Sequence, residues 1–258
     1  MSVLFEVKEH VARVTLNRPE RMNAVDAATT EELENIWQKI ESDPWIRCVV
    51  LTGTGERAFC AGADLKEDSG LSGVNYWAHS NPNGFGGLSL RKSLSTPVIA
   101  RVNGLALGGG MEMVLACDIV IASDTSKFGL PEAKVGRVPL DGGMILLPRL
   151  IPRNIAADLM MTGRMAGADE MASHGLVNSV VPADELDTEV DTWLANILKS
   201  APLSLRAIKA TMRDTATLQP LAGHALRTPE LMAALGSEDS EEGVKAFGEK
   251  REPLWRGE

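Results

Sequence analysis

The 258-residue sequence lacks features that define several large classes of protein. Its three cysteines and four histidines are scattered, which argues against a disulfide framework and against a metal site with closely spaced ligands. Acidic residues number 35 against 26 lysines and arginines, a net charge of −9, so the chain lacks the basic face that a nucleic-acid groove requires. A small anionic ligand held by a few local basic side chains is still compatible with this charge.

The sequence also has no long hydrophobic run. Its longest apolar stretch, around 113–122, is interrupted by Asp118 and is shorter than the roughly 20 residues that cross a bilayer. The first residues alternate in polarity and include acids, unlike a secretion signal. We therefore expect a cytoplasmic protein, and 44% hydrophobic residues in a chain of this length are typical of a substantial core.

Apolar segments and helical segments alternate along most of the chain. Alternating residues at 3–7 and 11–17 predict a hairpin, and Asp26 is a plausible cap for a helix that runs to about Ile40. Further buried strands are predicted at 48–53, 97–102 and 119–122. After about Asn196 the pattern becomes helical and too polar for a core, so this part is expected to pack on the main body or on a neighbouring subunit. The alternation indicates an α/β fold.

Three short segments have compositions that suit a ligand site. The small residues within 59–66 allow a backbone N–H to approach a ligand closely, although a tight turn explains them equally well. Gly108–Gly110 would expose N–H groups at the positive end of a helix dipole, with Glu112 in the first turn. Pro131 opens a second helical turn that holds Glu132. Taken alone, each glutamate is explained by a helix-start role, and the glycines lack the dinucleotide-binding spacing.

Taken together, the order and separation of these segments resemble the crotonase (enoyl-CoA hydratase/isomerase) family. The resemblance extends over nearly the whole chain, which makes a chance match very improbable. The matching segments are Leu16–Pro19, Asn23–Ala24, Ala61–Asp64, Asn103–Gly104, Gly108–Glu112, Ala116–Ile119, Phe128–Glu132, Thr162–Arg164, Gly175–Asn178 and Glu249–Arg251.

The resemblance implies a fold and a mode of assembly. Similar proteins form a spiral of ββα turns with two nearly perpendicular sheets, here expected over residues 1–196, which would hold coenzyme A and the active site. A C-terminal helical region, here 197–258, builds homotrimers or dimers of trimers in such proteins. Coenzyme A would enter as part of the thioester substrate, with no permanently bound cofactor. The expected partners are an acyl-CoA and further copies of the chain, without nucleic acid or membrane.

The resemblance also assigns roles to particular residues. The thioester oxygen would lie between the backbone N–H groups of Ala63 and Gly109, where two such donors stabilise an enolate by about 3 to 4 kcal/mol each. Glu112 and Glu132 would hold a water, one acting as base and the other supplying the proton at Cα. Residues expected to contact the substrate or its coenzyme A are Met22, Ala24, Ala61, Ala63, Asp64, Leu65, Lys66, Gly108, Pro131, Leu140 and Asp141.

Two positions depart from the family pattern. Leu140 replaces a small residue whose backbone helps to hold the water, and Asp141 adds a third carboxyl group, for which we expect a helix-capping role ahead of proton transfer. Tyr76, Trp77 and Phe85 are candidates to line the acyl pocket. Hydration or dehydration is the first expectation because both glutamates are present. A Δ-isomerase, a hydrolase or decarboxylase, and a non-catalytic binding protein stay open.

Overall fold

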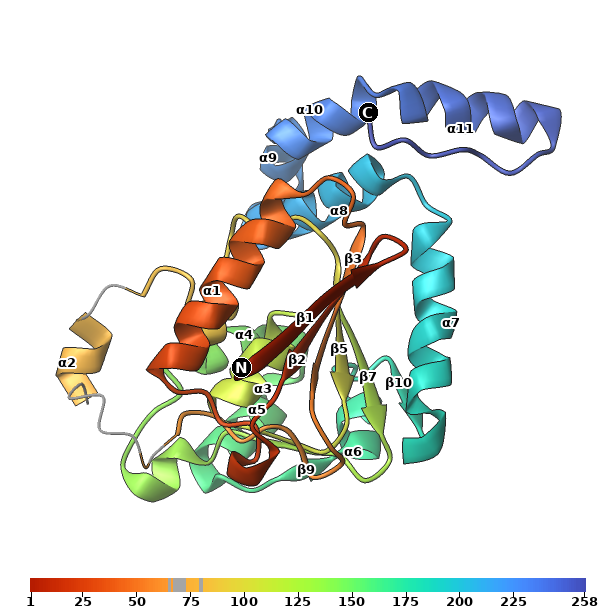
Figure 1. The fold of residues 1–258 in the computed structure, drawn as a ribbon. Coiled ribbons are helices and arrows are strands. Elements are labelled where there is room, and N and C mark those ends of the chain that lie inside the picture. The colour runs from red at the N-terminus through yellow and green to blue at the C-terminus, as the bar shows by residue number, and fades with distance from the viewer. Residues whose placement is uncertain (65, 67–72, 79–80) are drawn as a thin grey trace.

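The computed structural model describes residues 1–64, 66, 73–78 and 81–258, and Figure 1 shows the arrangement of its elements. Within these ranges, one sheet has six strands in the order β1-β2-β3-β5-β7-β10. The strands are β1 (Val3–Lys8), β2 (Val11–Leu16), β3 (Cys48–Gly53), β5 (Val98–Val102), β7 (Ile119–Ser123) and β10 (Ser179–Val181). Strands β1 and β2 form the predicted antiparallel hairpin, and the other neighbours are parallel.

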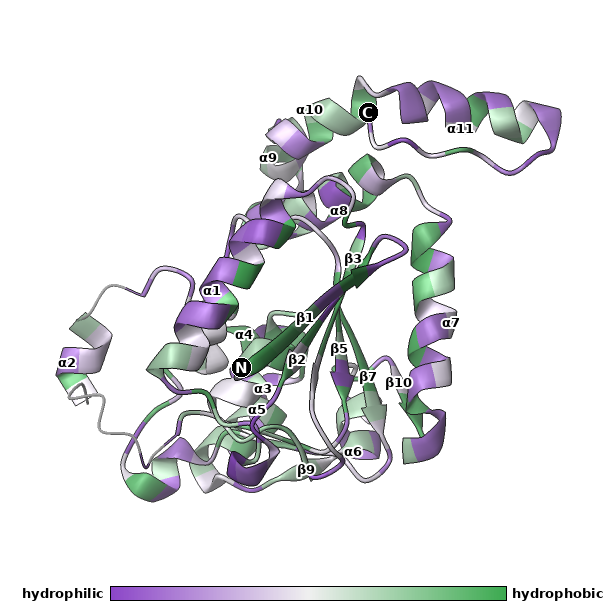
Figure 2. Cartoon of the chain, viewed as in Figure 1, coloured by the Kyte–Doolittle hydropathy of each residue, from purple (hydrophilic) through white to green (hydrophobic). Residues whose placement is uncertain are grey.

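The side chains of this sheet alternate between two hydrophobic cores, one on each face, and helices cover both. Val49 and Leu51 point into the larger core, where helix α1 (Ala27–Ser42) packs. Cys48 and Val50 point into a smaller core that is closed by α7 (Leu186–Leu198). Figure 1 shows the two helices on either side of the sheet, and Figure 2 shows the apolar residues of its strands.

A second sheet has four strands among the described residues, in the order β4-β6-β8-β9. They are β4 (Ala58–Cys60), β6 (Leu105–Leu107), β8 (Lys127–Gly129) and β9 (Ala166–Gly167). The chain visits the two sheets in turn, from β3 to β4, from β5 to β6 and from β7 to β8. Strands of two or three residues are too short to show a period of two, so the residue pattern alone does not predict them.

The second sheet determines where the loops after its strands meet. Strands β4, β6 and β8 are parallel neighbours, so their carboxyl ends lie at one edge. Helix α3 (Gly109–Leu115) follows β6, and the 3-10 helix η3 (Pro131–Val135) follows β8. Helix α4 (Gly143–Leu150) begins soon after η3. The three glycine-rich or acidic segments singled out in the sequence therefore converge.

The remaining helices surround this frame, and none in the described part of the chain is long and apolar enough to cross a membrane. They are η1 (Pro19–Arg21), α2 (Gly73–Ala78), η2 (Phe85–Gly87), α5 (Arg153–Thr162), α6 (Ala168–Ser173), η4 (Ala183–Glu185), α8 (Pro202–Thr215), α9 (Pro220–Ala225), α10 (Pro229–Leu235) and α11 (Glu238–Glu249). Helices α8 to α11 form the helical tail, and α11 extends away from the body (Figure 1). The expected boundary after residue 196 falls inside α7.

Candidate active site

The loops after β4, β6 and β8 come into direct contact. The Gly108 amide donates a hydrogen bond to the Gly129 carbonyl at 3.0 Å, which joins the ends of β6 and β8. A Cβ atom placed on Gly62 would lie 3.3 Å from the Gly109 nitrogen, so the loop after β4 passes directly over the start of α3. Ala63, Gly109 and Glu132 therefore lie close together although 69 positions separate the first from the last in the sequence.

The direction of the Ala63 amide follows from its pairing with Val25. The Val25 amide donates to the Gly62 carbonyl at 2.9 Å, and the Asp64 amide donates to the Val25 carbonyl at 3.0 Å. In such a parallel bridge, the residue between these two points its own N–H to the other side. Ala63 is exposed, and its N–H points away from Val25, as a donor to a ligand requires.

The Gly109 amide is the first of helix α3, where backbone N–H groups have no acceptor within the helix. Gly108 precedes it with φ of +55°, a conformation that favours glycine. The ring of Phe85 packs directly on Gly109, because an added Cβ would lie 2.6 Å from three of its atoms. Position 109 thus needs glycine for packing, and its amide faces the loop of Ala63.

A half-buried group of ion pairs holds the Ala63 loop in place. The Arg18 guanidinium lies 2.9 Å from the Asp64 carboxylate and 2.8 Å from that of Asp26, and it donates to the Ala24 carbonyl at 2.7 Å. The Lys66 amide also donates to Asp64, at 3.1 Å. The Asp64 side chain is therefore engaged within the protein, directly beside Ala63.

Glu112 lies one helical turn after Gly109 and is 3% exposed. Its Oε1 accepts a hydrogen bond from the Gly143 amide at 2.9 Å. Burial raises the pKa of Glu112 to about 8, and the negative charges of Asp141 and Glu132 act in the same direction, against the effect of the Gly143 amide. This carboxyl group keeps its proton at neutral pH.

Glu132 occupies the first turn of η3 and faces Gly108. Its Oε1 would lie 3.3 Å from a Cβ atom at Gly108. Its Oε2 is buried and finds no hydrogen-bond partner among the described residues. Burial also raises the pKa of Glu132 above its ordinary value. A buried oxygen without a partner is costly, so this position suits a water or ligand that donates a hydrogen bond.

Asp141 is buried beside the two glutamates, but it does not cap a helix. The cap of α4 is Gly142, which makes no side-chain capping bond. The Asp141 carboxylate instead accepts a hydrogen bond from the Tyr76 hydroxyl at 2.7 Å. The expected capping role was therefore wrong, because the side chain turns away from the helix and towards α2.

Some of the other residues predicted to contact the ligand lie near this site, and others do not. The Ala61 amide donates to the Met22 carbonyl at 3.1 Å, so the segment from Met22 to Ala24 lies alongside the loop as expected. Pro131 opens η3, and Leu140 is half-buried before Asp141. Lys66 is exposed, and Leu65 lies outside the described residues. Arg251 pairs with Glu242 and Glu249 of its own tail.

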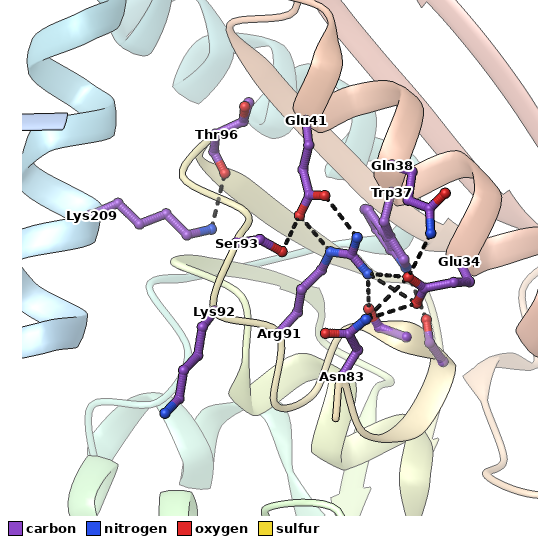
Figure 3. Close-up of polar contacts among 12 residues, drawn as sticks. Glu34, Trp37, Gln38, Glu41, Asn83, Arg91, Lys92, Ser93, Thr96 and Lys209 are labelled. Carbon is purple, nitrogen blue, oxygen red and sulfur yellow. Dashed lines mark hydrogen bonds and ion pairs between the residues drawn. The ribbon is translucent and has the colours of Figure 1, made fainter. Parts of the chain in front are cut away.

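The segment 83–93 is anchored to α1 by an ion-pair network that the sequence does not reveal. Arg91 lies between Glu34 and Glu41 of α1 (Figure 3), and its guanidinium nitrogens are 2.9 and 2.6 Å from their carboxylate oxygens. Asn83 donates to Glu34 and Ser93 donates to Glu41, so both ends of the segment are attached to the same helix. The segment carries Phe85 and thereby places its ring on Gly109. Of the other aromatic candidates, Tyr76 reaches Asp141, whereas Trp77 is 71% exposed.

Two residues that act on the site carry little signal in the sequence. Gly143 belongs to a glycine pair before a helix, a pattern that predicts a turn but not a donor to Glu112. Arg18 acts on Asp64 across 46 positions, and only the fold brings them together. The resulting arrangement has two backbone donors at one edge of a sheet and two protonatable carboxyl groups beside them. It suits a reaction in which a carbonyl oxygen gains negative charge while protons move at the neighbouring carbons.

Comparison with known proteins agrees with this geometry. The family model for enoyl-CoA hydratase/isomerase matches residues 6–258. An (E)-benzylidenesuccinyl-CoA hydratase of Thauera aromatica is 40% identical over 264 residues, covering 100% of both chains. A carnitinyl-CoA dehydratase of Escherichia coli strain K12 is 40% identical over 251 residues, 96% of this chain and 95% of the relative. Its likeness is already visible in the sequence at 130–134, 147–152 and 237–251.

The solved structures support the same relationship. An enoyl-CoA hydratase from Bacillus anthracis matches with a TM-score of 0.92 and 36% identity, and the match covers 100% of each chain. The resemblance inferred from the sequence and the α/β fold it implied are thereby confirmed. The chain belongs to the enoyl-CoA hydratase/isomerase family.

Proposed function

We propose that this protein catalyses the reversible addition of water to a 2-enoyl-CoA thioester. The thioester oxygen would lie between the amides of Ala63 and Gly109, which stabilise the enolate formed when the nucleophile adds at Cβ. One of the two carboxyl groups, Glu112 and Glu132, takes a proton from the water, and the other delivers a proton to Cα. The family and the names of its hydratase and dehydratase relatives support this reaction class.

The observation that carries the proposal is the contrast between the two carboxyl groups. Glu112 is 3% exposed with a pKa raised to about 8, so it holds a proton at neutral pH. Glu132 has a buried oxygen with no hydrogen-bond partner among the described residues, and its charge acts on Glu112. A water between them would satisfy that oxygen, and the pair would have both a proton to give and a lone pair to accept one.

Coenzyme A would lie along the loop of Ala61, Ala63 and Lys66, with Met22 and Ala24 beside it. The Asp64 side chain, engaged by Arg18, would shape this loop instead of contacting the ligand. The acyl group would extend towards Leu140 and Asp141. No permanently bound cofactor is needed, because the thioester itself activates Cα. Assembly into trimers through the helical tail and a cytoplasmic location stay predictions.

The acyl group is a separate question, because the relatives act on different ones. The names of two relatives, each 40% identical, refer to a benzylidenesuccinyl and a carnitinyl group. We propose a hydro-lyase without choosing between these groups. A Δ-isomerase is the second candidate, and the third carboxyl group, Asp141, is the observation that favours it.

The test is the loss of enoyl absorbance when the purified protein is mixed with crotonyl-CoA. We expect hydration by the wild type and a loss of at least about 100-fold in kcat for Glu112→Gln and for Glu132→Gln, since general acid–base catalysis contributes roughly that much or more. Glu185→Gln, at an exposed position on η4, is the matched control and should keep wild-type activity.

Two results would contradict the proposal. If neither crotonyl-CoA nor any other 2-enoyl-CoA is hydrated, the reaction class is wrong. Conversion of a 3-enoyl-CoA into its 2-enoyl isomer without hydration would establish the isomerase instead. Unchanged hydration by Glu112→Gln would leave the reaction standing but remove the assigned acid–base pair.

A further inference from the structure

Tyr76 and Asp141 form a hydrogen-bonded pair beside Glu112 for which the proposed reaction gives no role. They come from separate elements, Tyr76 from α2 and Asp141 from the turn before α4, and their side chains meet at 2.7 Å. The same turn continues to Gly143, whose amide donates to Glu112 at 2.9 Å. One short segment therefore brings both a hydrogen-bond donor and a carboxyl group to Glu112.

The charges around Glu112 are unbalanced. Asp141, from the turn before α4, and Glu132, from η3, act on Glu112 through their charges. Tyr76, from α2, is coupled to Asp141 and Glu112. The ion pairs formed by the described residues include none of the three carboxyl groups. Glu112 and Asp141 are buried and Glu132 is half-buried, so their charges oppose one another, and the hydrogen bonds they accept influence which of them is ionised.

Burial raises the pKa of Asp141, and the hydrogen bond from the Tyr76 phenol acts against burial and favours charge on Asp141. A hydroxyl that donates to a carboxylate stabilises its ionised form. Burial and the hydrogen bond to Asp141 raise the pKa of Tyr76 well above its ordinary value, so the phenol stays a donor across the physiological range. Negative charge on Asp141 then opposes a second negative charge on Glu112.

We propose that Tyr76 and Asp141 act as positioning residues that fix the charge of Asp141 beside Glu112 and so retain the proton on Glu112 in the free enzyme. The role of this pair in turnover rests on the proposed hydratase function. It explains why a carboxyl group stands in the turn before α4, where it caps nothing, and why α2 carries a tyrosine whose hydroxyl reaches into the site.

The direct test is the pH profile of kcat/KM for crotonyl-CoA, which reports the titration of groups in the free enzyme. Asp141→Asn keeps an acceptor for Tyr76 but removes the charge. We expect its alkaline limb to move to lower pH by roughly 1, as removal of a nearby like charge predicts. Tyr76→Phe should shift the limb in the same direction by less, since Asp141 then keeps only part of its charge.

The double variant shows whether Tyr76 acts through Asp141. If it does, Tyr76→Phe in the Asp141→Asn background adds no further shift. Asp184→Asn, which removes an exposed carboxylate from η4, should leave the limb unmoved. An alkaline limb that Asp141→Asn does not move, or equal shifts from Tyr76→Phe in both backgrounds, would overturn the proposal.

A measurement independent of turnover separates this inference from the proposed function. The side-chain carboxyl resonances of ¹³C-labelled glutamate report the protonation of Glu112 directly, with Glu112→Gln to assign the signal. The Glu112 midpoint should fall in Asp141→Asn whether or not crotonyl-CoA is hydrated. If hydration is absent and the midpoint falls, the charge arrangement stands and the reaction class fails. If hydration is present and the midpoint is unmoved, only the positioning role is lost.

Discussion

Glu112 is a carboxylic acid in surroundings that favour its neutral form, and this has a consequence for stability. Its pKa rises on folding from 4.5 to about 8. Below pH 4.5 the group is protonated in both the folded and the unfolded chain. Between these values the unfolded chain releases the proton and the folded chain retains it, so the free energy of unfolding falls as the pH rises towards 8. The full loss is at most about 5 kcal/mol.

We therefore expect Glu112→Gln to stabilise the protein more at pH 8.5 than at pH 5. Glutamine is neutral at both values and can still accept the Gly143 hydrogen bond, so the variant lacks the pH-dependent loss. Urea unfolding of both proteins at the two pH values gives the difference in unfolding free energy. Glu185→Gln should show no such difference. A stability gain that is independent of pH would mean that Glu112 titrates as an ordinary surface glutamate.

Individual residues also mark the limit of inference from the sequence. Glu112 and Glu132 each have a sufficient structural explanation as helix-start acids, and only their place in a family pattern selects them as a pair. The partner of Asp64 lies 46 positions away at Arg18, and that of Asp141 lies 65 positions away at Tyr76. Local spacing carries no information about such contacts, which is why Asp141 was wrongly expected to cap a helix.

Elements are where sequence patterns were most informative. The long strands β3 and β5 and the helix that Asp26 caps follow from apolar periodicity and cap chemistry, and the structure confirms them. The second sheet does not follow from such patterns, because β4, β6 and β8 are three residues each. Their pairing is set by the spiral path of the chain, so the edge that carries the candidate site was accessible only through the family resemblance.

The segment 83–93 is held to α1 by Arg91, whose side chain is 3% exposed. We expect Arg91→Met to lower the free energy of unfolding by about 3 kcal/mol or more, because it leaves Glu34 and Glu41 without a cation in a partly buried place (Figure 3). Chemical unfolding at neutral pH measures the loss.

The chain offers a matched control for this change. Arg164 also pairs with two carboxylates, Asp158 and Glu170, but its side chain is 37% exposed. Arg164→Met should cost no more than about 1 kcal/mol, since exposed ion pairs are weak. Replacing Glu34 and Glu41 by glutamine in the Arg91→Met background should recover part of the stability. Equal losses for Arg91→Met and Arg164→Met would show that burial does not strengthen the network.

At the scale of the whole molecule, the C-terminal residues cover one face of helix α11, and another face of this helix is exposed. The C-terminal residues fold back on the helix: the amides of Arg256 and Gly257 donate to Asp239, and the Trp255 ring lies against Gly243. Val244 and Phe247 lie three residues apart and are 75% and 87% exposed. An apolar pair this exposed on a helix that extends from the body favours a contact with another copy of the chain (Figures 1 and 2).

We expect Val244→Glu with Phe247→Glu to reduce the oligomer while the fold is retained. The wild type should sediment as a trimer or a multiple of it, as its family resemblance implies, and the double variant as a smaller species with an unchanged circular dichroism spectrum. Lys245→Glu, exposed on the same helix, controls for the added negative charge. A monomeric wild type, or a double variant with the wild-type mass, would show that this face has no role in assembly. If the double variant keeps the mass of an oligomeric wild type, assembly has to use other exposed apolar residues of the tail, such as Leu221, which is 82% exposed.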